Sequence, residues 1–158
     1  MAEHEHGTQI SMPSITHELD WFLQILVDLV NKTGLGIPIT LLVGGSIVTG
    51  LLASGKDYFN NFADELKGSF SGMPDFSEEA AESLVSGYRE IAKGIYDPTH
   101  SEGADQTSTA PAPLPQFVHL RNAYILVPGQ LEPKDRPIWW RGRLASVDAF
   151  FLGTLNQS

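Results

Sequence analysis

The sequence contains no cysteine, which excludes disulfide bonds, catalytic thiolates and zinc–thiolate sites. Basic residues are also scarce, with 10 Lys and Arg against 19 Asp and Glu and a net charge of −9. An acidic chain repels phosphate backbones, so its composition argues against a general nucleic-acid-binding protein. The first residues lack the basic region and apolar run of a secretory signal. The absence of cysteine fits a protein of a reducing compartment.

The acidic charge is divided unevenly along the chain. Residues 1–114 contain 16 acidic and 5 basic residues, whereas residues 115–158 contain 3 acidic and 5 basic residues. The basic segment could therefore meet the acidic segment of another copy, or an acidic partner. A solvated surface that keeps the protein soluble is the simpler interpretation of the same pattern.

The longest stretch without charge is residues 33–55, between Lys32 and Lys56. Its length invites interpretation as a membrane span. Pro38 and five glycines, at positions 34, 36, 44, 45 and 50, make a poor helix of residues 34–50. Gly44-Gly45 at the centre suits a two-residue hairpin turn. We therefore expect a hairpin instead of a membrane span.

This hairpin predicts its own register, because a turn at Gly44-Gly45 places Thr40 opposite Thr49. One face of the hairpin would then consist of four large apolar side chains, those of Ile39, Leu41, Val48 and Leu52. The other face is also rather apolar. Either the N-terminal helix or another subunit is expected to cover it.

The rest of the chain divides into helices and strands around this hairpin. A helix is expected to begin at Thr16 and to end within residues 31–34. Its apolar stripe consists of Leu19, Phe22, Leu23, Leu26, Leu29 and Val30. Two further helices are expected. One carries Phe59, Phe62 and Leu66 and stops at Gly68, and the other begins at Ser77 and carries Leu84, Tyr88, Ile91 and Ile95.

Three strands complete the predicted fold: residues 117–127, 138–145 and 149–155, with a tight turn at 146–148. The fold class is α+β, with an N-terminal helix and a small, curved antiparallel sheet of about five strands. We expect this sheet to close as an SH3- or Sm-like barrel, with a helical insertion between strands 2 and 3.

The domain organisation follows from composition and length. Residues 1–14 are polar and predict a disordered tail, and residues 15–155 predict a single α+β domain. Inside this domain, the acidic, proline-rich residues 97–115 predict a disordered linker, because they offer little apolar surface to offset ordering entropy.

No catalytic set stands out in the sequence. His119, Ser146 and Asp148 have the composition of a Ser-His-Asp triad, but no nucleophile-elbow sequence accompanies them. We therefore interpret His119 as a surface or partner-bonded strand residue. The sequence predicts no enzyme activity, no cofactor and no metal site.

The strongest residue-level indication of binding lies in the strand at 138–145. Adjacent residues of a strand point to opposite faces, so either Trp139 or Trp140 should point away from the core. Trp and Arg are enriched at protein interfaces. The predicted interaction residues are therefore Trp139, Trp140, Arg141 and Arg143.

Two of these segments resemble a known family. Phe117-Val118-His119-Leu120-Arg121-Asn122 and the closing run from Trp139-Trp140-Arg141-Gly142-Arg143 to Phe150-Phe151-Leu152-Gly153 resemble the gas vesicle accessory protein U family. Ile39-Thr40-Leu41 and Lys56-Asp57-Tyr58-Phe59 also look like its hairpin and following helix, whereas Ala149 replaces the usual glycine.

The resemblance implies a non-enzymatic cytoplasmic accessory protein that acts on gas vesicle assembly or clustering. Its expected partners are other copies of itself, the vesicle shell and other accessory proteins. The alternative interpretation is an Sm-like ring that binds RNA or protein.

Overall fold

The structure, a computed structural model, describes residues 19–71, 73–74, 77–96, 113–128 and 130–155. The predicted tail at 1–14 and most of the predicted linker, residues 97–112, lie outside the described residues. The described part contains three α-helices and six strands. In chain order they are α1 (Trp21–Thr33), β1 (Ile37–Val43), β2 (Ser46–Ala53), α2 (Gly55–Phe70), α3 (Glu78–Tyr96), β3 (Phe117–Val127), β4 (Gln130–Glu132), β5 (Ile138–Arg143) and β6 (Val147–Leu152).

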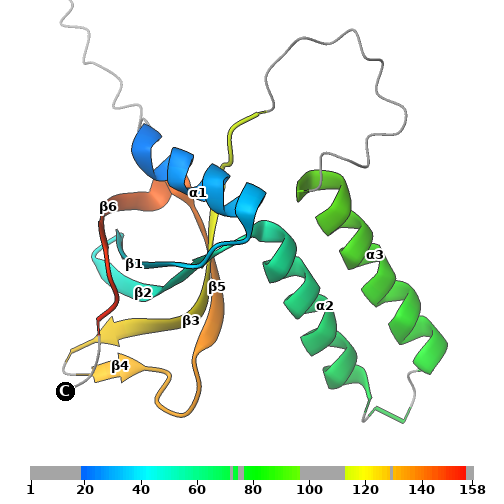
Figure 1. The fold of residues 1–158 in the computed structure, drawn as a ribbon. Helices are drawn as coiled ribbons and strands as arrows, with labels where there is room; N and C mark the ends of the chain where they lie inside the picture. The colour runs from blue at the N-terminus through cyan, green and yellow to red at the C-terminus, as the bar shows by residue number, and fades with distance from the viewer. Residues whose placement is uncertain (1–18, 72, 75–76, 97–112, 129, 156–158) are drawn as a thin grey trace, which may run out of the picture.

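The strands form one curved antiparallel sheet, which α1 crosses on one side while α2 and α3 stand beside it as a helical hairpin (Figure 1). The strand order is β4-β3-β2-β1-β6, and β5 also pairs with β3. The predicted α+β class with a curved sheet is therefore confirmed. The sheet has six strands, one more than the number predicted, since the sequence did not predict the short β4. The sheet is not closed, so the predicted barrel is not confirmed.

The β1–β2 hairpin has the predicted register. Thr40 pairs with Thr49, and Gly44 and Gly45 form the turn with φ values of 56° and 81°. Positive φ at both turn residues explains the need for glycine. Among the described helices, none is long and apolar enough to cross a membrane.

The hydrophobic core lies between α1 and the sheet. The four large apolar side chains predicted to form one face of the hairpin are buried there, and they pack with Leu23, Val27 and Val30 of α1. The helix begins later than predicted, because the side chain of Asp20 caps it by accepting from the backbone N–H groups of Phe22 and Leu23. Thr16 lies outside the described residues. Phe22 and Leu29, predicted to belong to the buried stripe, are exposed.

The α2–α3 hairpin differs from the prediction at two points. Gly68 does not end α2, which continues to Phe70. The residues of α3 that are buried are Ala81, Val85 and Ala92, whereas the predicted stripe residues Leu84, Ile91 and Ile95 are exposed. Small side chains let α3 pack closely on α2, and this turns the larger side chains outward.

The closing strands do not form the predicted hairpin. A short 3₁₀ turn at Leu144–Ser146 joins β5 to β6, and the two strands then pair with different neighbours, β3 and β1. The described end of the predicted linker contacts α1. The carbonyl of Pro115 accepts a hydrogen bond from Gln24 Nε2 at 3.0 Å, which fixes the chain before β3 against α1.

Candidate functional site

The four predicted interaction residues lie on β5 but face different surroundings. Trp140 pairs with Leu120 and packs against the core, where its ring lies so close to Gly142 that a Cβ there would overlap it. Trp139 lies on the other face, with its ring centroid 6.2 Å from that of Tyr58 in α2. Neither tryptophan is a freely exposed ring, because α2 covers the one that points away from the core.

The two arginines of β5 are exposed. The guanidinium carbon of Arg141 lies 3.6 Å from the ring centroid of Phe117, in the geometry of a cation–π contact. Arg143 pairs with Phe117 across the β3–β5 ladder. The role of all four residues in binding stays a prediction.

His119 is fully buried, contrary to its interpretation as a surface or partner-bonded residue. Three aromatic rings surround it, with centroids 4.8 Å (Tyr58), 6.3 Å (Phe59) and 6.0 Å (Tyr96) from its own. Neither ring nitrogen has a hydrogen-bond partner in the described part of the chain. Asp148 instead accepts from the backbone N–H of Gly44 at 2.8 Å, so these residues do not form a triad.

The environment of His119 keeps its imidazole neutral. Burial, and to a smaller extent the positive charge of Arg141, its partner across the ladder, together lower the pKa of His119 to about 4. Burial also raises the pKa of Tyr96, and Arg141 partly offsets that rise. His119 and the three rings around it therefore form an uncharged contact between the sheet and the α2–α3 hairpin, and we call this aromatic cluster the joint.

A cleft of about 860 Å³ lies beside this joint, and we call it the junction cleft. It forms where the end of α1, the start of α2 and the end of α3 approach one another (Figure 1). Residues Asn31 and Gly55 hold two of these ends together, because Asn31 Oδ1 accepts from the backbone N–H of Gly55 at 2.9 Å. The third end is held by Tyr96, whose ring lies against Gly55.

The walls of the junction cleft carry both charge signs and several apolar side chains. Lys32 pairs with Asp28 at 2.6 Å on α1, and further cations come from Lys56 of α2 and Arg141 of β5. Apolar walls come from Phe59, Ile95 and Phe117. Groups of three or more metal-binding side chains are absent from the described residues.

A second surface is the outer sheet face, which we define as Leu42, Ile47, Leu126 and Phe151. Ladder pairs join Leu42 to Ile47 and Ile47 to Leu126, so these side chains are contiguous. Leu42, Ile47 and Phe151, with Ala149 and neighbouring residues, line an apolar hollow of about 230 Å³. Helix α1 covers the opposite face of the hairpin, and Phe151 on the outer face is 52% exposed.

A comparison with protein families decides the identity of the chain. A model of the family described as gas vesicle protein GvpU-like matches residues 20–155. The chain belongs to the gas vesicle protein GvpU-like family. The resemblance predicted from the β3 and β5–β6 segments is thereby confirmed, and the family is a gas vesicle accessory family. Neither a curated protein nor a solved structure matches the chain.

The joint and the junction cleft of this GvpU-like protein were missed by sequence reasoning, because their residues come from segments far apart. In the structure, the consecutive residues Val118, His119 and Leu120 are all buried, and a strand buries three consecutive residues only when both of its faces are covered. The aromatic pair Tyr58-Phe59 supplies the second cover.

Proposed function

We propose that this chain is a non-catalytic cytoplasmic accessory protein of gas vesicles. It acts by self-association and by contact with the vesicle shell or other accessory proteins, during vesicle assembly or clustering. The observation that carries the proposal is the family match over residues 20–155, which includes every described helix and strand. The uncharged joint around His119 and the lack of a catalytic set in the described residues are in keeping with a binding role.

The outer sheet face is the proposed surface for self-association. Apolar side chains on the open face of a sheet, beside an unpaired strand edge, are typical of an interface. Leu42 and Phe151 supply such side chains. Among the described strands, β6 pairs with β1 alone, so its other edge is unpaired there. The excess of acid in residues 1–114 and of base in residues 115–158 adds attraction between unlike regions of two copies.

An Sm-like ring is the alternative form of this assembly. It is favoured by one feature of the topology: β5 and β6 follow each other in the chain, joined by a 3₁₀ turn, yet pair with different strands. Each therefore has an edge that could receive a strand of the next copy. RNA as the partner is disfavoured by the net charge of −9.

Flotation tests the vesicle association directly. The purified protein is mixed with intact gas vesicles, which are buoyant, and the floating layer is collected after slow centrifugation. We expect the protein in the floating layer. Recovery of all the protein from the liquid below would contradict the vesicle role.

Light scattering tests the self-association. We expect a molar mass above that of one chain at micromolar concentration, and a mass that falls as salt rises because unlike charges are screened. Phe151→Lys should reduce the mass, and Ala145→Lys, which adds the same charge at an exposed residue of the 3₁₀ turn, should not. A salt-independent monomer would contradict self-association.

A further inference from the structure

Helix α3 carries an apolar stripe that faces away from its own subunit. Leu84 is 41% exposed and Ile91 is 46% exposed, although α3 buries a separate apolar face against α2. The exposed residues recur at alternating steps of four and three, the spacing of a helix–helix seam. We call this set the α3 seam: Ala80, Leu84, Gly87, Ile91 and Gly94.

In the described part of the chain, no neighbour requires glycine at the two glycine positions of the α3 seam. A Cβ added at Gly87 or at Gly94 would have no atom of these residues within 4 Å. Glycine is unfavourable in a helix interior, so its presence twice on one stripe requires a reason. Close approach of another helix is such a reason, because a missing side chain lets two backbones come together.

The stripe is complementary to itself when two copies run antiparallel. Leu84 then lies opposite Gly94 of the other helix, and Ile91 lies opposite Gly87. Both pairings occur in one register, because both are centred on position 89. Each large side chain meets a glycine, whereas a parallel pairing would place large residues against large ones.

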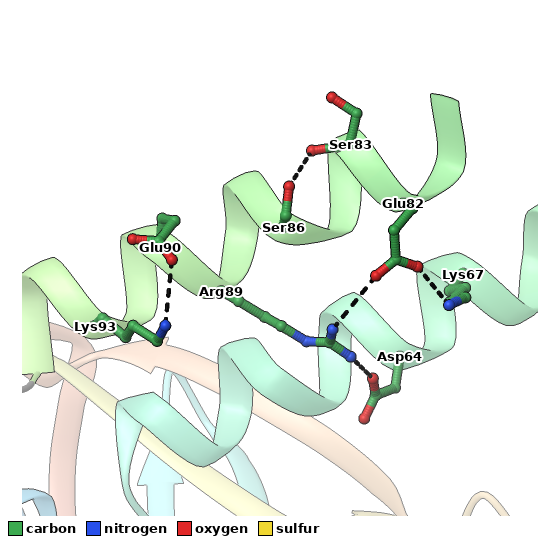
Figure 2. Close-up of polar contacts among 8 residues, drawn as sticks. All are labelled: Asp64, Lys67, Glu82, Ser83, Ser86, Arg89, Glu90 and Lys93. Atoms are coloured by element: carbon green, nitrogen blue, oxygen red, sulfur yellow. Dashed lines mark hydrogen bonds and ion pairs between the residues drawn. The ribbon is translucent and has the colours of Figure 1, made fainter. Parts of the chain in front are cut away.

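The charges of α3 are compatible with this arrangement. No residue of the seam is charged, and Glu82 and Arg89 extend toward α2, where they pair with Lys67 and Asp64 (Figure 2). Glu78 and Glu79 lie in the first turn of α3, and Lys93 lies in the last turn. An antiparallel pair therefore brings the acidic start of one helix toward the basic end of the other.

We propose that the α3 seam binds the α3 seam of a second copy, antiparallel and centred on position 89. The four helices of the two α2–α3 hairpins then form one bundle. This proposal rests on the self-association proposed above and adds a surface separate from the outer sheet face. Two separate surfaces on one chain would allow assemblies larger than a dimer.

Disulfide trapping tests the register, because the chain has no cysteine of its own. Gly87→Cys and Ile91→Cys are made as separate full-length proteins with different tags, mixed and mildly oxidised. We expect the mixed disulfide between positions 87 and 91 to form in preference to the 87–87 and 91–91 products. Preferential formation of the two like pairs, or of no disulfide at all, would overturn the proposal.

Alanine at the glycines gives a second test, in which stability and association move in opposite directions. Gly87→Ala with Gly94→Ala should raise the melting temperature of the isolated subunit, because alanine favours the helix. The same change should weaken the α3 contact about tenfold by crowding the seam. Gly68→Ala is the control, because Gly68 is a helical residue of α2 that also has open space beside it.

The outcomes separate this proposal from the one on which it rests. If Phe151→Lys removes the larger assemblies and the 87–91 disulfide still forms, both surfaces act independently, as proposed. If association persists in wild type but the alanine pair leaves it unchanged, the α3 proposal alone is wrong. If the 87–91 disulfide forms but the protein does not float with vesicles, the vesicle role alone is wrong.

Discussion

The hydroxyl groups of Thr40 and Thr49 lie 2.9 Å apart in the buried centre of the β1–β2 ladder. Thr40 Oγ1 donates to the carbonyl of Gly153 at 2.8 Å, and Thr49 Oγ1 accepts from the backbone N–H of Leu155 at 2.9 Å. A hydroxyl has one hydrogen, so Thr49 must be the donor to Thr40. The resulting chain of hydrogen bonds ties the segment after β6 to the hairpin.

Replacing Thr49 with valine should therefore destabilise the protein although the shape is retained. The change leaves the Leu155 N–H without its acceptor and Thr40 Oγ1 without its donor. We expect a loss of about 1–3 kcal/mol in the free energy of unfolding, measured by urea denaturation. Thr154→Val, at an exposed residue nearby, is the control. Equal stability of the two variants would show that the hydrogen-bond chain contributes little.

Gly55 sets the position of the helical hairpin, because the ring of Tyr96 occupies the space of a side chain at this residue. Gly55→Ala should force Tyr96 to move and should cost about 1–3 kcal/mol in the free energy of unfolding. The matched control is Gly68→Ala, where a Cβ meets open space and should stabilise α2 slightly. A Gly55→Ala protein as stable as wild type would mean that α3 can shift without loss.

The sequence predicted those parts of the fold that local chemistry determines. Gly44-Gly45 requires positive φ at both residues, which fixes the turn and hence every pair of the β1–β2 ladder. The strand at 117–127 was predicted with the observed bounds because apolar, strand-favouring residues dominate it. The family was predicted from the closing run, and the family match confirms it.

The errors concern the faces that tertiary packing selects. Periodicity identified the apolar residues of α3, but α3 has two apolar faces, and its small residues pack inside while Leu84 and Ile91 stay outside. The bend at 146–148 is a good turn sequence, and it wrongly predicts that the two strands of the closing run pair with each other as a hairpin. Its strands instead pair with β3 and β1, which the local sequence does not specify.

The apolar side chains of the closing run differ in burial. Leu144 is buried, whereas Phe150 is half-buried and Leu152 is 60% exposed. Leu144→Ala should cost about 2–5 kcal/mol in the free energy of unfolding, because it leaves a cavity. Leu152→Ala should cost less than about 1 kcal/mol. Urea denaturation of both variants checks the difference, and equal losses would contradict the structure.

The last prediction is a pH dependence of stability caused by His119. In the unfolded chain its pKa is about 6.5, and in the folded protein burial lowers it to about 4. The unfolded state therefore binds more protons between these values, so the free energy of unfolding falls as pH falls from 6.5 to 4. The contribution of neutral His119 is fully present above pH 6.5 and is lost through this window, with a total on the order of 3 kcal/mol.

Carboxylates titrate in part of the same window, so the test compares wild type with His119→Phe. An apolar ring removes the two buried nitrogens that have no partner in the described part of the chain, and it suits a site lined by Tyr58, Phe59 and Tyr96. We expect the variant to be at least as stable as wild type at pH 7. Its advantage should grow as pH falls from 6.5 to 4, because phenylalanine has no proton to gain. Urea denaturation at pH 7.0, 5.5 and 4.5 measures the free energy of unfolding of both proteins. A difference in this free energy that stays constant with pH would mean that His119 is protonated equally well in the folded and the unfolded state.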